Sequence, residues 1–188
     1  MRKLPKALQK GPFTYKQTLA AGLNLRSVRQ LVAYEQCYTV AKGIYIPTSL
    51  DYNEENQFKA ATLVVGAPSA ICLLSALSVY NLTDEIPRQT WIIVPKSKRT
   101  NVRSLKILRM SDPMWDIGIE KKNGYSITSI ERTIVEAFCY KRMLGSNVAV
   151  EALREGIKNK LTTGSKVLSM AQKLGVVHRL LPYLEAIA

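Results

Sequence analysis

The hydrophobic positions between residues 13 and 47 follow the spacing of helices first and of strands afterwards. A short helix is expected from Tyr15 to Ala21 and a longer one from Leu25 to Tyr34, where apolar residues recur on one face. Aromatic and β-branched residues then predominate from Tyr38 to Ile46, interrupted by Lys42-Gly43. The pattern therefore predicts two helices followed by a β-hairpin with a basic turn.

The residues at the expected helix ends favour this division. Thr14 and Gln17 have the spacing of a capping box, in which each side chain binds the other residue's backbone N–H. Gly22 can adopt the left-handed conformation that ends a helix, and Asn24 can cap the next one. Two helices, a tight turn and a hairpin are typical of a winged helix-turn-helix, which we expect to occupy residues 1–49.

Residues 50–188 are expected to form a C-terminal mixed domain with a small, largely antiparallel sheet and several helices, so the predicted fold class is α+β. A helix is expected from Asn53 to Gly66, and the apolar run from Ser69 to Tyr80 predicts a buried helix. Further on, Arg132 and Glu136 have the spacing of an intrahelical ion pair. Strands are expected at residues 90–95 and 104–110 and on both sides of Asn123-Gly124, and amphipathic helices at residues 129–141, 147–159 and 165–174.

Positive charge is concentrated in the predicted winged helix. The chain has a formal net charge of +13, and residues 1–50 contain eight Lys or Arg against one Glu, a net charge of +7. Residues 51–100 contain five basic and five acidic residues and are neutral. A polyanion is the expected partner, because cations that neutralise phosphates release condensed counterions. A basic but merely solvated surface is the alternative.

The candidate DNA contacts lie on both predicted helices and on the hairpin turn. Polar and basic side chains outside the apolar face of the second helix can donate to base edges or phosphates. The candidate DNA-binding residues are Thr14, Lys16, Asn24, Arg26, Ser27, Arg29, Gln30 and Lys42. A second candidate polyanion-binding group, for which a solvated loop is an equal alternative, is Lys96, Lys98, Arg99 and Arg103.

The cysteines indicate neither a disulfide framework nor a zinc site. Cys37, Cys72 and Cys139 are odd in number, far apart and never in a C-x-x-C spacing, so reduced thiols in or near the core are expected. No run approaches the ~18 apolar residues of a spanning helix, and the basic N-terminus has no apolar signal segment. A cytoplasmic protein with no membrane partner is therefore expected.

The sequence contains few candidate catalytic residues. Glu85 and Lys96 loosely follow the acid-then-lysine order of metal-dependent nucleases, but intervening prolines leave no compact metal-ligand spacing. The single histidine, His178, has no neighbouring nucleophile, and the glycines form no phosphate-binding loop. We therefore expect no enzymatic activity, no catalytic residue, no metal and no nucleotide or other cofactor.

Together with the predicted winged helix, five later segments resemble, in their order and spacing, the AbiEi antitoxins of type IV toxin-antitoxin systems. These antitoxins are the transcriptional regulators of abortive-infection E, a phage-defence system. The resemblance covers almost the whole chain. Its segments are LSALSVYNLTDEIP, WIIVP followed by basic residues, ITSIERTIVEAF, VAVEALREGIK and LLPYLEAIA.

The resemblance implies a DNA-binding repressor of its own operon whose C-terminal domain carries the antitoxin activity. It implies a nucleotidyltransferase-like toxin as the genetic partner, without a stable complex between the two proteins. The expected DNA partner is the protein's own promoter, with repeated half-sites, bound by a chain that is a monomer in solution or a weak dimer on DNA. The alternatives are a basic adaptor for RNA or an acidic protein and, less favoured, a metal-dependent nuclease.

Overall fold

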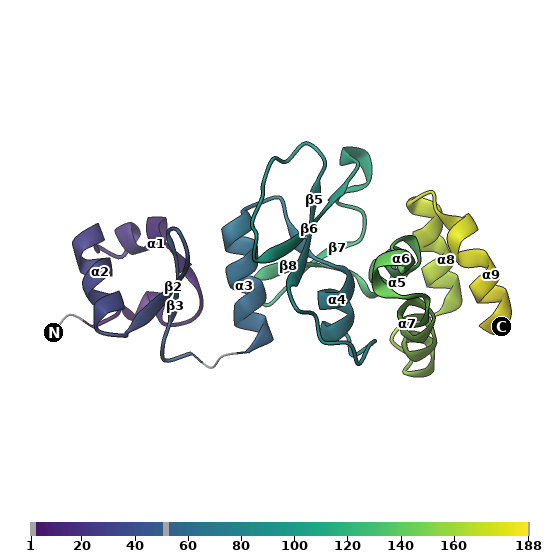
Figure 1. Ribbon diagram of the computed structural model, residues 1–188, viewed down its shortest axis with the longest axis horizontal. Helices are drawn as coiled ribbons and strands as arrows, with labels where there is room; N and C mark the ends of the chain where they lie inside the picture. Colours follow the sequence, from purple (N-terminus) through teal and green to yellow (C-terminus); the bar gives the residue numbers. More distant parts are fainter. Residues whose placement is uncertain (1–2, 51–52, 188) are drawn as a thin grey trace. The chain divides into compact units, whose positions relative to one another are not determined.

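The chain folds into two compact units that divide later in the sequence than predicted. The computed structural model describes residues 3–50 and 53–187, and the units are Met1–Ala67 and Pro68–Ala188 (Figure 1). The sequence placed the boundary after residue 49, where a polar stretch begins. The boundary instead follows the next helix, because that helix packs against strands of the first unit.

This helix, α3 (Glu54–Val65), contacts strands β1 (Phe13–Thr14) and β3 (Ile44–Pro47). It begins where the sequence predicted, since the side chain of Asn53 accepts the backbone N–H of Asn56 at 2.9 Å. It ends before Gly66, whose φ of 75° lies in the left-handed region. The helix bounds were therefore predictable from local capping residues, but its membership of the first unit was not.

The first unit contains both predicted helices and the predicted hairpin, beside a short 3-10 helix near the N-terminus. The strand order is β1-β3-β2, and both pairings are antiparallel. The additional elements are η1 (Lys6–Leu8), α1 (Tyr15–Ala20), α2 (Leu25–Ala33) and β2 (Cys37–Ala41). Their buried apolar side chains are Leu4, Leu8, Phe13, Leu23, Val28, Leu31, Cys37 and Tyr45.

The second unit contains a five-stranded sheet, which makes the whole chain α+β. Its strand order is β6-β5-β4-β8-β7, in which β5/β6 and β4/β8 are parallel and the other two pairs antiparallel. The prediction of a largely antiparallel sheet is therefore wrong. The two parallel pairs arise because the chain crosses over between β5 and β6, through residues 96–104, and between β4 and β8. The strands are β4 (Ala70–Ile71), β5 (Thr90–Pro95), β6 (Leu105–Met110), β7 (Ile119–Lys122) and β8 (Tyr125–Thr128).

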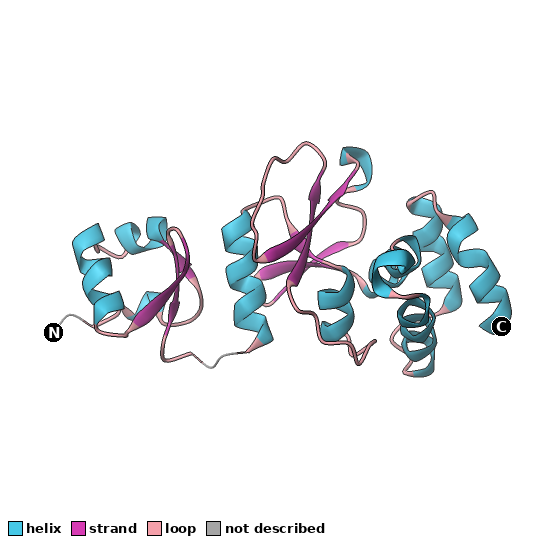
Figure 2. Ribbon diagram, viewed as in Figure 1, coloured by secondary structure: helices cyan, strands magenta, loops and turns pink. Residues whose placement is uncertain are grey.

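The apolar run predicted as one buried helix from Ser69 to Tyr80 forms two elements. Strand β4 comes first, followed by helix α4 (Leu73–Val79), which packs beside β5 (Figure 2). Leu73 has a φ of 44°, so the chain changes direction between the strand and the helix. The prediction failed because a run that is apolar on all sides does not distinguish a buried strand from a buried helix.

Helices follow the sheet, as the sequence predicted, and enclose an apolar core of the second unit. Helix α5 is central, because it contacts α4, α7, α8 and α9. Among the described residues, no helix is both long enough and apolar enough to cross a bilayer. The elements are η2 (Asp112–Met114), α5 (Ile130–Cys139), α6 (Lys141–Leu144), α7 (Ser146–Lys158), α8 (Gly164–Lys173) and α9 (Val177–Ile187).

Candidate nucleic-acid interface

The first turn of α1 is held by the predicted capping box. The Thr14 hydroxyl accepts the backbone N–H of Gln17 at 3.2 Å, and the Gln17 side-chain oxygen accepts the backbone N–H of Thr14 at 2.7 Å. The same Gln17 oxygen also accepts the Thr14 hydroxyl proton at 3.0 Å. Thr14 therefore shapes the start of α1, and its hydroxyl proton is already donated within the chain.

The turn between α1 and α2 is closed by backbone hydrogen bonds and a buried side chain. The N–H groups of Gly22 and Leu23 donate to carbonyl oxygens of α1, at 3.0 and 2.9 Å, and Gly22 has a φ of 75°. Leu23 is buried between the helices. Asn24 then caps α2 by accepting the backbone N–H of Ser27 at 2.8 Å. The orientation of α2 relative to α1 is thereby determined by a short, fully bonded turn.

Helix α2 separates an apolar face from a polar one. Val28 and Leu31 are each 1% exposed, whereas Arg26, Arg29 and Gln30 are exposed. The apolar face was predicted correctly at these two buried positions. Leu25 fits the apolar spacing in the sequence, but it is 46% exposed and does not belong to that face.

The Ser27 side chain is not presented to solvent, so Ser27 is removed from the candidate DNA contacts. It is 4% exposed, and its hydroxyl donates to the Asn24 side-chain oxygen at 2.9 Å. A serine near a helix N-terminus commonly bonds locally in this way, so its polar character did not indicate exposure. Asn24 itself is exposed, but its side-chain oxygen accepts two bonds from Ser27.

The hairpin turn lies against the start of α1. The backbone N–H of Tyr15 donates to the carbonyl oxygen of Gly43 at 2.7 Å, and Gly43 has a φ of 76°. This bond brings the chain at Lys42 beside the chain at Lys16. The side chains of Lys16 and Lys42 are both exposed. The bond joins residues far apart in the sequence, and no local pattern could have predicted it.

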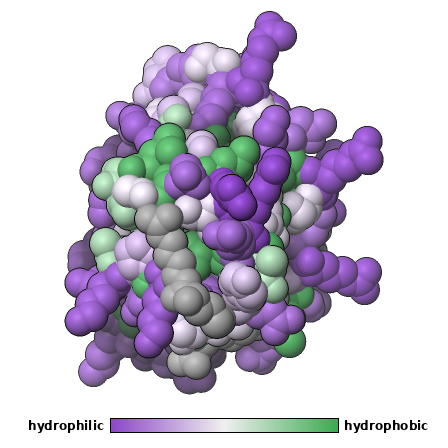
Figure 3. Space-filling view, turned by 90° about the vertical axis from the view of Figure 1, so that its left-hand side faces the viewer, coloured by the Kyte–Doolittle hydropathy of each residue, from purple (hydrophilic) through white to green (hydrophobic). Residues whose placement is uncertain are grey.

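The face drawn in Figure 3 is rich in hydrophilic side chains around a smaller hydrophobic area. Within the described part of the chain, Lys16, Arg26, Arg29 and Lys42 form no ion pair. Their charges are therefore not neutralised by carboxylates of the described residues and remain free to attract an anion.

The second basic group lies on the loop between β5 and β6, which hydrogen bonds hold in place. Lys98 donates to the carbonyl oxygen of Pro68 at 3.3 Å, and partial burial lowers the pKa of its amine. The Ser97 hydroxyl donates to Asp112 at 2.9 Å, while Lys96 and Arg103 are exposed. The loop is thus structured, and it presents cations to solvent at both of its ends.

The two residues that the sequence compared with a nuclease, Glu85 and Lys96, do not line the same cavity. Glu85 lines a cavity of about 330 Å³, but Lys96 is not among the residues that line it. Within residues 3–50 and 53–187, no cluster of His, Cys, Asp or Glu has the composition of a metal site. The three cysteines are free thiols, with Cys37 and Cys72 buried and Cys139 half-buried.

Comparison with known proteins gives a likeness of fold only. No family model matches the chain, and no curated protein matches it significantly. Among solved structures, the chain is similar to the crystal structure of the RV2827C protein from Mycobacterium tuberculosis, with a TM-score of 0.61 and 12% sequence identity. The match covers 94% of this chain and 76% of that one. At this identity the likeness bears on the fold and not on the activity.

Proposed function

We propose that the first unit is a winged helix-turn-helix that binds double-stranded DNA, and that the chain represses its own operon. The observation that carries the proposal is the convergence of cations on three adjacent parts of this unit. Lys16 lies on α1, Arg26 and Arg29 lie on α2, and Lys42 lies at the hairpin turn that is bonded to α1. A set of cations that has no carboxylate partner among the described residues suits a phosphate backbone.

In the proposed complex, α2 enters the major groove. Arg29 and Gln30 are exposed on it and carry the donors that read guanine and adenine edges. Lys16 and Lys42 would neutralise phosphates on either side of the groove. Thr14 would support this surface by capping α1, and Ser27 by donating to Asn24, the cap of α2. Neither would contact DNA through its hydroxyl proton, because both protons are donated within the chain.

We also propose that the second unit carries an antitoxin activity against a nucleotidyltransferase-like toxin. The support is the resemblance of its sequence to the AbiEi antitoxins, whose motifs lie mainly on α4, β5, α5, α7 and α9. As in that family, no stable complex between antitoxin and toxin is expected. The proposed DNA complex contains a monomer or a weak dimer on repeated half-sites.

Footprinting on the DNA upstream of the gene tests the repressor proposal. Specific protection of repeated half-sites is expected from the natural chain. The double variant Arg29→Ala and Lys42→Ala should weaken binding at least ~10-fold, because each removed side chain contributes about 1 kcal/mol or more. Lys158→Ala is the matched control, since this exposed lysine lies in the second unit and pairs with Glu155. Uniform weak protection, or an equal loss in the control, contradicts the proposal.

Coexpression with the toxin tests the antitoxin proposal separately. Cells that express a nucleotidyltransferase-like toxin from the same operon should be rescued by the natural chain and equally by the Arg29→Ala and Lys42→Ala variant. Loss of rescue in a folded variant would show that DNA binding and antitoxicity share one surface. Cleavage of DNA in the presence of Mg²⁺, abolished by Glu85→Ala, would instead support a nuclease.

A further inference from the structure

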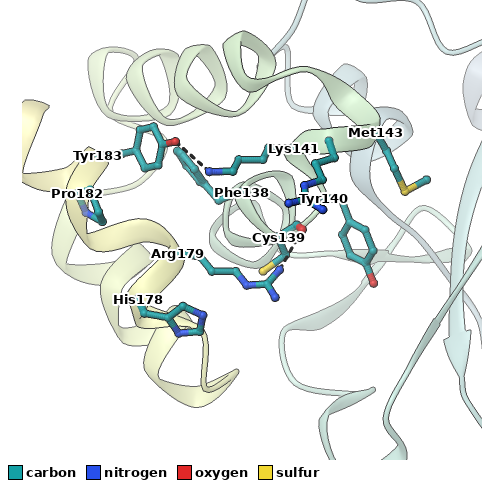
Figure 4. A pocket seen from close by; sticks show the side chains of 10 residues that line it. Phe138, Cys139, Tyr140, Lys141, Met143, His178, Arg179, Pro182 and Tyr183 are labelled. Atoms are coloured by element: carbon teal, nitrogen blue, oxygen red, sulfur yellow. Dashed lines mark hydrogen bonds between the residues drawn. The ribbon is translucent and has the colours of Figure 1, made fainter.

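Helices α5, α6 and α9 of the second unit surround a basic pocket with a volume of about 650 Å³ (Figure 4). Its wall contains Lys141, Arg142, His178 and Arg179, and none of its lining residues is acidic. These residues come from two segments about forty positions apart in the sequence, so only the folded unit brings them together. The volume is in the range typical of small-molecule sites.

Two of the cations are positioned by contacts within the pocket. The Lys141 amine donates to the Tyr183 hydroxyl at 3.1 Å and lies 5.3 Å from the centre of the Tyr183 ring. Arg179 donates to the carbonyl oxygen of Cys139 at 3.1 Å (Figure 4). Tyr183 also packs on Phe138, with 4.7 Å between ring centres. The pocket therefore combines oriented cations with an aromatic wall.

A smaller cavity of about 230 Å³ adjoins the basic pocket and shares Cys139, Tyr140 and Arg179 with it. Glu136 lines this cavity, and its side chain is only 2% exposed. One carboxylate oxygen, Oε1, binds Arg132, whereas Oε2 is buried without a hydrogen-bond partner among the described residues. A buried acceptor without a donor is costly, so this oxygen calls for a donor that the described residues do not provide.

We propose that the basic pocket and the adjoining cavity together bind a mononucleotide. Its phosphates would lie against Arg142 and Arg179, because guanidinium groups form paired, charge-assisted bonds with phosphate oxygens. Its base would pack on the aromatic wall around Tyr183 and direct an N–H group to Oε2 of Glu136. The site has no glycine-rich phosphate loop, which is why the sequence predicted no nucleotide. The proposal does not depend on DNA binding by the first unit.

Calorimetric titration of the full-length chain with the four ribonucleoside triphosphates tests this site. At least one should bind with a Kd below ~1 mM, and Arg142→Ala and Arg179→Ala should each weaken its binding at least ~10-fold, the effect of losing one charge-assisted bond. Arg142 is exposed on the short α6, so its replacement should leave the fold intact, which circular dichroism checks. Lys173→Ala, at an exposed lysine on α8 outside the pocket, is the charge-matched control.

Further measurements separate a nucleotide site from simpler explanations. Pyrophosphate should bind more weakly than the best nucleotide, and the nucleotide should slow the labelling of Cys139 by a maleimide, because Cys139 lines both cavities. Equal binding of pyrophosphate and nucleotides overturns the proposal in favour of a plain anion site. It is also overturned if no nucleotide binds, if the Lys173→Ala control loses as much affinity, or if only oligonucleotides bind.

Discussion

The guanidinium of Arg132 and the carboxylate of Glu136 form an ion pair of 2.9 Å inside the second unit, with side chains 0% and 2% exposed. Arg132 also donates to the backbone carbonyls of Trp115 and Ile117, the first at 2.6 Å. One side chain therefore attaches the segment before β7 to helix α5. The spacing of the two residues predicted their pairing, which the structure confirms, but it did not indicate that the pair is buried.

Replacement of Arg132 by Met should destabilise the second unit by about 3 to 5 kcal/mol, since it leaves a buried carboxylate without its partner. Burial raises the pKa of Glu136, and Arg132 opposes that rise. The variant should therefore have a still higher Glu136 pKa. When the pKa of a carboxyl is higher in the folded than in the unfolded state, its contribution to stability is complete below the unfolded-state pKa. That contribution is lost as pH rises through the folded-state pKa. Urea denaturation should show a larger loss at neutral pH than at about pH 5.

The double variant Arg132→Met and Glu136→Leu provides the control for this prediction. Removing both charges leaves no isolated carboxylate, so its unfolding free energy should recover most of the loss and vary less with pH. The carbonyl oxygens of Trp115 and Ile117 are deprived of the Arg132 donor in both variants, which limits the recovery. If the Arg132→Met variant loses the same unfolding free energy at both pH values, the result contradicts the role assigned to Glu136.

Gly118→Ala should destabilise the second unit by about 1 to 3 kcal/mol more than Gly175→Ala, through overpacking. Both glycines have a φ of 67°, so the backbone strain of the substitution is matched. A Cβ at Gly118 would lie 2.9 Å from the Met170 side chain and 3.2 Å from that of Arg132, whereas one at Gly175 meets only Met114 at 4.0 Å. Thermal denaturation compares the two, and equal losses would show that Met170 moves aside freely.

Much of the first unit could be predicted because its signals are local. The capping box of Thr14 and Gln17 spans three residues, and the turn at Gly22 requires one special φ value. The burial of Ser27 could not be predicted, because a serine on the polar side of a helix can face either solvent or its own cap. Helical periodicity predicts the face of the helix on which a residue lies, but it does not determine which side chains form local hydrogen bonds.

The second unit was less predictable because its sheet depends on distant pairs. Ile71 pairs with Ile92 on one side and with Ile127 on the other, and neither partner is indicated by residues near Ile71. The order of the strands is therefore a tertiary property, and the prediction of a largely antiparallel sheet assumed that neighbours in sequence pair. The basic pocket was missed for the same reason, since Lys141 and His178 lie on separate helices.

If the first unit binds DNA as proposed, its affinity for DNA should fall as salt concentration rises. The steepness of that fall should depend on the candidate cations. A plot of log K against log salt should become less steep by about 0.9 for each phosphate that is no longer neutralised. Lys16→Ala and Lys42→Ala should each change the slope by about that amount, because the two lysines are proposed to bind phosphates. Arg29→Ala should instead reduce discrimination between operator and unrelated DNA. Titrations at several salt concentrations measure both quantities, and unchanged slopes would remove the lysines from the interface.

Thiol labelling should distinguish Cys139 from the other two cysteines in the folded chain. Cys37 and Cys72 are 1% and 0% exposed, while Cys139 is half-buried at the pocket wall. Burial raises the pKa of all three thiols, and Arg179 partly opposes this effect at Cys139. Cys139 should therefore react first with a maleimide, faster as pH rises because the thiolate is the nucleophile, and Arg179→Ala should slow it at a given pH. Mass spectrometry of timed samples measures the order. Reaction of Cys72 before Cys139 would show that the sheet region of the second unit opens more readily than the pocket.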